Sequence, residues 1–474
     1  MIAPIVPVDL DALRQYLGDG PAGSGLHPIG LRAVTIGQGA LDELVPTVLR
    51  LVPPGASVVV LVDATPMRRG ARDLKAHVRT LLEARFQVRV EVLGRDRPEL
   101  HADEAASAEA DRAIEGAACV VTVGSGTVTD LGKDSSHRAG GIPFVVVQTA
   151  VSVNAFSDDM AVLLRNGVKR TVPSRWPSAL IVDLETIGDA PPEMNRAGFG
   201  ELISMFTAPA DWYLASAIGM DDAYDERVVR LFGERASQLL AIAPGVAEHR
   251  YEALAELAGF MTLTGIAMGA AGRTAPLSGM EHTVSHLLDM AAEGAGRPLA
   301  FHGAQVGAAA AVVSITWRRF LRRFDPASLR AESAYPSAGQ MEPRVRAAFR
   351  ELDPTGRVGD ECWRDYAQKL DRWTVQRAGV EQFIRDWPHH RAAMEGILAT
   401  PEAIADALHR AGAPARFRDL NPPADGSTVR WALGHCHLMR NRFTVADLAY
   451  WTGHWDGAAV EDVLAEAAGM GVGL

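Results

Sequence analysis

Cysteine, positive charge and long apolar runs are all scarce in this chain. Its three cysteines, Cys119, Cys362 and Cys436, stand far apart among 474 residues, which suits neither a disulfide framework nor a thiolate metal cluster and favours a reducing compartment. The formal net charge is −11 without any block of basic residues, which argues against nucleic acid or an anionic membrane as the main partner. No apolar run approaches the length of a membrane span. We therefore expect a cytoplasmic protein that binds neither nucleic acid nor membrane.

Valine-rich apolar runs recur through the first part of the chain and then stop. They span 56–63, 86–94, 118–126, 142–150 and 179–187. Stretches with helical periodicity, such as 68–85, separate them, and this alternation is typical of an open α/β domain with a buried parallel sheet. After residue 187 the patterns are helical to the end of the chain. We predict an α/β domain over 1–190 and an all-helical domain over 191–474, with 322–343 as a surface connection or insertion.

A glycine-containing turn follows the third of these runs, in the sequence "GSGTVTD" from Gly124 to Asp130. Glycines between a strand and a helix let backbone amides approach a pyrophosphate, and the helix N-terminus favours negative charge. A tight turn that needs glycine for its backbone angles explains the same residues, because the full G-x-G-x-x-G fingerprint is missing. Asp63 ends an earlier strand and is either a ribose ligand or a turn former. Both interpretations stay open on the residues alone.

Two histidines, His282 and His286, stand four residues apart in "SGMEHTVSHLLD". On a helix this spacing places both imidazoles on one face, as in metal-binding helices. The same spacing occurs on ordinary amphipathic helices, and two ligands make an incomplete site. The segment alone favours the ordinary helix.

Several stretches, taken in order, resemble a known family. They are "VGSGTVTDLGK", "VQTAVSVNAFSDD", "VKRTVPSRWPSALIVDLETI", "AGFGELISMFTAPADWYLA", "SGMEHTVSHLLD", "FHGAQVG" and "HLMRNRFTVADLAYWTG". The chain resembles the iron- or zinc-dependent alcohol dehydrogenase superfamily, which also holds glycerol dehydrogenase and dehydroquinate synthase. Within it, the sn-glycerol-1-phosphate dehydrogenases are the most similar. The likeness covers nearly the whole chain and is weakest around 320–390.

The resemblance implies a divalent metal, expected to be zinc, in a cleft between a nucleotide domain (1–190) and a metal- and substrate-binding helical domain (191–474). Its three ligands would be Glu201, His282 and His302. One carboxylate oxygen and two imidazole nitrogens suit Zn²⁺ and leave a position open for substrate. His286 falls outside this triad and is expected to support it or to pack between helices.

The resemblance also implies NAD or NADP as a cofactor. The residues expected to contact its pyrophosphate are Gly124, Ser125, Gly126 and Thr127. Thr149 and Ser152 are expected near the nicotinamide, and Asp63 at the ribose. Asp130 and Lys133 match the family's "GGGxxxDxxK" pattern, although a solvated Asp and Lys pair explains them equally well. Lys169 is either a phosphate ligand or a solvated turn residue.

Four positions depart from the family pattern. Glu201 replaces the usual Asp of the glycerol-1-phosphate dehydrogenases, and Ala304 replaces a glutamate. Asn154 stands where an aspartate near the nicotinamide and substrate is common, so we retain it as a catalytic candidate. Arg273 is displaced by two residues from an expected arginine. If that arginine helps to hold a substrate phosphate in the family, these departures predict a changed substrate.

The function implied is a metal- and NAD(P)-dependent dehydrogenase that interconverts a small polyol phosphate and its ketone or aldehyde, such as sn-glycerol 1-phosphate and dihydroxyacetone phosphate. A homo-oligomer is also expected. Two alternatives stay open: a cyclase of the dehydroquinate synthase type, and a repurposed member without catalysis. Ser204 stands where the cyclase motif carries a lysine, which favours the dehydrogenases.

Overall fold

The computed structural model describes residues 8–18, 25–97, 99–165 and 168–474. By its internal packing the chain forms two compact units. The first, called here the sheet unit, comprises Met1–Arg165, Lys169–Gly198 and Ser237–Arg273. The second, called the helical unit, comprises Asn166–Val168, Phe199–Ala236 and Thr274–Leu474. The functional division at residue 190 stays a prediction, because it concerns what each part binds as well as how it packs.

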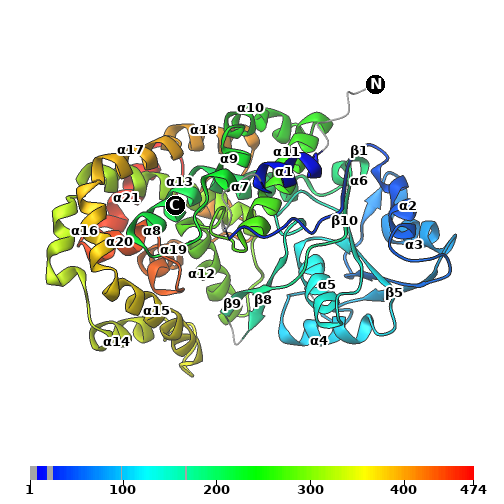
Figure 1. The fold of residues 1–474 in the computed structure, drawn as a ribbon, viewed down its shortest axis with the longest axis horizontal. Coiled ribbons are helices and arrows are strands. Elements are labelled where there is room, and N and C mark those ends of the chain that lie inside the picture. The colour runs from blue at the N-terminus through cyan, green and yellow to red at the C-terminus, as the bar shows by residue number, and fades with distance from the viewer. Residues whose placement is uncertain (1–7, 19–24, 98, 166–167) are drawn as a thin grey trace. The chain divides into compact units, whose positions relative to one another are not determined.

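Six parallel strands form the sheet of the sheet unit (Figure 1). They are β1 (Ala33–Gly37), β2 (Ser57–Val62), β5 (Gln87–Val92), β6 (Cys119–Gly124), β7 (Phe144–Gln148) and β10 (Ala179–Asp183). Their order is β1-β10-β7-β6-β2-β5. The predicted α/β domain with a parallel sheet is confirmed, and each of the five predicted runs contains a strand. The first strand, β1, was not predicted; it lies beside β10.

Two details of the sequence prediction are wrong. The stretch 68–85 is not one helix: it begins with a hairpin of β3 (Arg68–Arg69) and β4 (Arg72–Asp73), and α3 (Leu74–Glu83) follows. Asp73 caps α3 by accepting a hydrogen bond from the Ala76 N–H, which fixes where the helix starts. The run 179–187 ends as a strand at Asp183, which caps the short α6 (Leu184–Gly188).

Helices cover both faces of the sheet. On one face α2 (Leu44–Leu49) and α3 bury leucines and valines against alternate residues of the inner strands. On the other, α4 (Glu104–Ala113) and α5 (Gly126–Arg138) pack, and Gly132 of α5 lies so close that a Cβ there would stand 2.5 Å from Thr122 Cγ2. Coverage of both faces explains why the inner strands β2, β6, β7 and β10 are largely apolar, whereas the edge strand β5 alternates polar residues with valines.

The remaining elements of the sheet unit, some shared at its boundaries, complete it. They are α1 (Leu10–Gly18), the hairpin β8 (Met160–Arg165) and β9 (Val168–Pro173), α7 (Pro192–Ile203), α10 (Ala236–Ala247) and α11 (Tyr251–Ala271). Although α11 comes late in the chain, it packs in this unit: a Cβ on its Gly269 would meet Trp176, and one on Gly265 would meet Ser157. By length and composition α11 could cross a membrane, contrary to the expectation that no apolar run does so, yet 83% of its apolar window is buried within the protein.

The helical unit carries no strand after β10 within the residues that the structure describes, as predicted. Its helices are α8 (Ala208–Ile218), α9 (Glu226–Gly233), α12 (Met280–Gly294), α13 (His302–Arg323), α14 (Ala338–Ala348), α15 (Arg357–Val375), α16 (Arg377–Arg385), α17 (Trp387–Ile397), α18 (Pro401–Ala411), α19 (Gly426–His435), α20 (Val445–Trp451) and α21 (Gly457–Gly469). The stretch 322–343 contains two short 3₁₀ helices whose Leu329 and Ala334 are buried, so this connection is part of the packed fold.

A buried ion network ties α5 to the segment after β7. The Lys133 ammonium is fully buried and pairs with Asp158, and Asp130 lies 3.5 Å away. Lys133 also donates to the Ala155 carbonyl, at 2.7 Å, and to the Met160 carbonyl. Burial raises the pKa of Asp130 to about 7 and that of Asp158 to about 6, against the opposing effect of Lys133. The solvated interpretation of the Asp130 and Lys133 pair is therefore wrong.

We expect Lys133→Met to lower the free energy of unfolding by about 3–5 kcal/mol at pH 8, since it leaves two buried carboxylates without a cation. The loss should be smaller at pH 5.5, because both carboxyl groups bind protons in the folded variant there and the buried charge disappears. Urea unfolding at the two pH values measures both effects.

Arg79→Met is the matched control, because Arg79 forms an exposed pair with Glu83 at 2.6 Å and its loss should cost less than about 1 kcal/mol. Equal destabilisation by the two variants would contradict the assigned role of Lys133.

Candidate functional site

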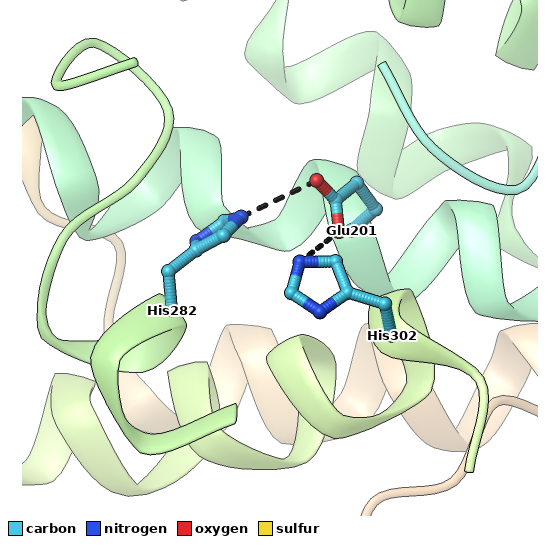
Figure 2. Close-up of side chains that lie close together, drawn as sticks. All are labelled: Glu201, His282 and His302. Atoms are coloured by element: carbon cyan, nitrogen blue, oxygen red, sulfur yellow. Dashed lines mark hydrogen bonds and ion pairs between the residues drawn. The ribbon is translucent and has the colours of Figure 1, made fainter. Parts of the chain in front are cut away.

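Three side chains from separate segments of the helical unit meet in its interior (Figure 2). Glu201 lies on α7, His282 in the first turn of α12, and His302 at the start of α13. Close helix packing brings them together: a Cβ on Gly200 would stand 2.4 Å from the Gly303 carbonyl oxygen. Glycine at position 200 is therefore required for Glu201 to approach His302.

Both imidazoles face the Glu201 carboxylate. His282 Nε2 lies 3.3 Å from Glu201 Oε1, and His302 Nε2 lies 3.9 Å from Oε2. The possible ligand atoms of the three residues all lie within 4.8 Å of one another, and within the described ranges this is the one such group of His, Cys, Asp and Glu side chains. The three residues thus surround one point from three directions.

The other ring nitrogens are already engaged. His282 Nδ1 lies 3.0 Å from Glu281 Oε1, and a carboxylate there accepts the Nδ1 proton. His302 Nδ1 lies 3.0 Å from Ser285 Oγ, whose own proton goes to Gln305 Oε1 at 2.7 Å. Each histidine therefore carries its proton on Nδ1 when neutral and presents the lone pair of Nε2 to the centre of the group.

The electrostatics of the group favour a cation at its centre. Glu201 is 2% exposed, and its Oε2 is buried without a hydrogen-bond partner. Burial raises the pKa of Glu201, but the two histidines outweigh it and hold that pKa below its usual value. Burial likewise lowers the pKa of His282, and Glu201 and Glu281 outweigh it, raising it to about 9. A proton on His282 neutralises the carboxylate where no metal does, and a divalent ion satisfies all three groups at once.

His286 lies beside this group without joining it. Its ring stacks on that of His302, with centroids 5.4 Å apart, and meets the His282 ring edge-on at 6.3 Å. The ligand group does not include it. Helical spacing places His282 and His286 on one face of α12. The second histidine of the group, His302, comes instead from α13, and the carboxylate comes from α7.

The predicted nucleotide residues gather at one edge of the sheet. The strand order reverses between β2 and β6, which pair directly. At the carboxyl end of β6, Gly124 leads into α5, and at the end of β2 stands Asp63. Crevices at such a reversal are where open α/β sheets bind nucleotides. Gly124, Ser125, Gly126 and Thr127 stand at this edge, where they remain predicted cofactor contacts.

The two acidic candidates have local partners. Asp63 accepts hydrogen bonds from the Thr65 N–H and hydroxyl, at 3.1 and 3.0 Å, and pairs with Lys75 at 3.1 Å. Asp130 is buried beside Lys133. If Asp63 contacts the ribose, it does so while also stabilising this turn. Asp130 would affect the cofactor only indirectly, by fixing the position of α5.

The loop after β7 is held firmly in the sheet unit. Thr149, Ser152 and Asn154 are each 7% exposed. Asn195 Oδ1 accepts a hydrogen bond from the Val151 N–H at 2.9 Å, and a Cβ on Gly198 would lie 1.6 Å from the Val151 carbonyl oxygen. Neither Asn195 nor Gly198 was singled out from the sequence, although both stand in the stretch just before Glu201.

Two basic residues singled out from the sequence, Lys169 and Arg273, also have interaction partners in the fold. Lys169 lies on β9, and Arg273 follows α11. Both take part in polar interactions within the fold. The structure thus brings the metal candidates together in the helical unit and most cofactor candidates to the sheet unit.

The chain is similar in sequence to known proteins. Residues 35–191 match the protein family described as "Iron-containing alcohol dehydrogenase". A glycerol-1-phosphate dehydrogenase [NAD(P)+] of Bacillus licheniformis is 26% identical over 91% of this chain and 92% of its own length. One from Aeropyrum pernix is 30% identical over 62% of this chain and 82% of its own.

Solved structures share the fold. A probable glycerol dehydrogenase from Sinorhizobium meliloti aligns with a TM-score of 0.56 at 17% identity, over 93% of this chain and 97% of its own. A maleylacetate reductase from a Rhizobium species aligns with a TM-score of 0.53 at 17% identity, over 92% and 96%. At this identity the likeness concerns architecture alone.

The glycine turn yields a prediction about nucleotide affinity. A Cβ on Gly126 would lie 2.7 Å from Val153 Cγ2, so a substitution there first needs room. We expect Gly126→Val combined with Val153→Ala to fold like Val153→Ala alone, yet to bind NADH and NADPH at least about tenfold more weakly, because the added side chain keeps the pyrophosphate from the backbone amides. Fluorescence titration measures the affinity, and the Val153→Ala single variant is the control. Equal affinity in both variants would contradict a pyrophosphate contact at Gly126.

Proposed function

This chain belongs to the iron-containing alcohol dehydrogenase family and is an oxidoreductase of that family, and from its site we propose that it is an sn-glycerol-1-phosphate dehydrogenase that uses a divalent metal and NAD(P). The reaction interconverts the secondary alcohol of sn-glycerol 1-phosphate and the ketone dihydroxyacetone phosphate. One observation carries the proposal: the group of Glu201 and His282, both buried, and His302, which is partly exposed, with both Nε2 atoms facing the carboxylate. The family resemblance inferred from the sequence motifs is confirmed.

When bound, a divalent ion supplies Lewis-acid polarisation of the substrate oxygen, and NAD(P) supplies or accepts the hydride. The protein's own residues prepare for both. Glu201 remains ionised in the interior because the histidines lower its pKa, and the Nδ1 hydrogen bonds orient His282 and His302. Three ligands leave a position open for the substrate oxygen.

We assign zinc as the metal on the chemistry of its donors. One carboxylate oxygen and two imidazole nitrogens form a set of the kind found in catalytic zinc sites. Zinc is also redox-inert, so the metal would act only on the oxygen while the nicotinamide carries the electrons. Iron in the same site is the alternative that a metal analysis distinguishes.

The substrate assignment rests on the relatives named as glycerol-1-phosphate dehydrogenases. Two departures limit acid–base chemistry near it: Ala304 and Asn154 provide no carboxylate where the family commonly has one. Glu281 and Glu201 are then the carboxylates in contact with the histidine ligands. We also propose a cytoplasmic location, in keeping with three buried free cysteines. The expectation of a homo-oligomer rests on the family resemblance alone.

A substrate screen tests the proposal. We expect NADH or NADPH oxidation with dihydroxyacetone phosphate after zinc is added to chelator-treated protein, and at least about tenfold lower kcat/KM with dihydroxyacetone, because the phosphate adds binding energy. Activity on unphosphorylated ketones alone would move the assignment to glycerol dehydrogenase chemistry. Phosphate release without net change in nicotinamide absorbance would indicate the cyclase.

The metal ligands have their own test. We expect His282→Ala and His302→Ala to lose metal affinity by more than the 10–100-fold that removal of an outer hydrogen-bond partner typically costs. His286→Ala should retain the metal, because His286 lies outside the ligand group. Elemental analysis after dialysis against a weak chelator reports the content. Metal retained by His302→Ala but lost by His286→Ala would show that the helix pair, not the proposed triad, is the site.

A further inference from the structure

Glu281 is a buried carboxylate with a full set of donors. Its side chain is fully buried. Oε1 accepts from the Gly279 N–H at 2.6 Å and faces His282 Nδ1 at 3.0 Å, while Oε2 accepts from the Thr207 hydroxyl at 3.0 Å. A charge in the protein interior is retained only where such donors compensate its lost hydration.

The contact with His282 is unusual for residues adjacent on a helix, because neighbouring side chains point in different directions. It occurs here at the first turn of α12, where Gly279 precedes the helix. A Cβ on Gly279 would lie 2.5 Å from Asp211 Oδ2 and 3.1 Å from Glu281 Oε2. Asp211 accepts the Met280 N–H at 2.8 Å and the Val445 N–H at 2.7 Å. Two buried carboxylates, those of Asp211 and Glu281, therefore hold the backbone at the start of α12.

The two histidines of the group are held differently. His302 Nδ1 contacts the neutral Ser285 hydroxyl, which donates to Gln305, and Gln305 in turn donates to Asp289 at 2.9 Å. His282 Nδ1 contacts a carboxylate directly. Hydrogen bonds to an ionised partner are roughly twice as strong as neutral ones, and a carboxylate partner makes the imidazole a more basic ligand.

We propose that Glu281 is a positioning residue for the metal site: it fixes the His282 ring with Nε2 toward Glu201 and makes His282 the stronger of the two imidazole donors. The inference rests on the proposed function, since it concerns the metal that this function requires. Glu281 touches no substrate or cofactor in this role and acts through His282 alone.

Zinc affinity of three variants tests the proposal. Glu281→Gln keeps the size of the side chain and an acceptor for Nδ1 but removes the charge, and it should weaken Zn²⁺ binding by about 10–100-fold. Ser285→Ala should weaken it less. Thr207→Val is the matched control: it removes a donor from the same carboxylate without touching His282, and it should lower thermal stability while leaving zinc affinity within about twofold of the wild type.

Competition with a chromophoric chelator gives the affinities, and thermal unfolding of the metal-free proteins gives their stability. Wild-type affinity in Glu281→Gln, or a larger loss in Ser285→Ala, would overturn the proposal while leaving the proposed function intact. A loss in Thr207→Val as large as in Glu281→Gln would show that Glu281 only stabilises the helix start, and would also overturn it. A wild-type protein that binds no divalent ion would refute the proposed function and this inference together.

A second measurement compares the two histidines within the wild-type protein. In zinc-loaded protein with ¹⁵N-labelled histidine, the Nδ1 proton of His282 should resonate downfield of that of His302, because it is bonded to a carboxylate rather than a hydroxyl. Glu281→Gln and Ser285→Ala assign the two signals, because each changes the Nδ1 partner of one histidine only. The reverse order of the signals would contradict the difference between the two histidines.

Discussion

The burial of one carboxylate organises the helical unit. Glu201 loses its hydration in the interior, and one of its oxygens receives no hydrogen bond. Such a charge is tolerable only beside positive charge. Two imidazoles face it, and their remaining nitrogens are tied to Glu281 and Ser285 so that the rings cannot turn away. The close approach of α7 and α13 at Gly200 follows from the same requirement.

The sheet unit also relies on buried contacts to hold its loops in place. Two sets of buried contacts fix the segments around its glycine turn at the end of β6. Lys133, on α5, holds the segment near residues 155–160, and Asn195 and Gly198 hold the loop at Val151. These contacts would hold the turn in place for the pyrophosphate contact predicted there.

Much of this could be predicted from the sequence. A continuous apolar signature identified the buried strands β2, β6, β7 and β10, and recurring valines identified the edge strand β5, where they alternate with polar residues. The motif resemblance pointed to Glu201, His282 and His302, which the fold brings together. The short strand β1 was missed because its "AVTIG" is too brief to stand out. The hairpin at 68–73 was missed because charged residues in a two-residue strand resemble the start of a helix.

Interactions that depend on three-dimensional packing were also beyond sequence reasoning. Asn195 and Gly198 act through a loop more than forty residues earlier in the chain, and no periodicity records such a pairing. Glu281 directly precedes His282 in the sequence, but residues adjacent on a helix are not expected to touch. The geometry at Gly279 allows their side chains to make contact. The burial of Lys133 likewise depends on Asp158, which follows the next strand.

The place of α11 has a consequence for how the protein is made. The sheet unit takes its last helix from Tyr251–Ala271, after the chain has already contributed Phe199–Ala236 to the helical unit. During synthesis the sheet can pair its strands once β10 has emerged from the ribosome, but the surface that α11 covers, around Trp176 and Ser157, remains bare for tens of residues more. Domains generally fold as units during translation. Here the first unit must wait for a helix that is apolar enough to resemble a membrane segment, so both the waiting surface and the emerging helix are natural targets for a chaperone.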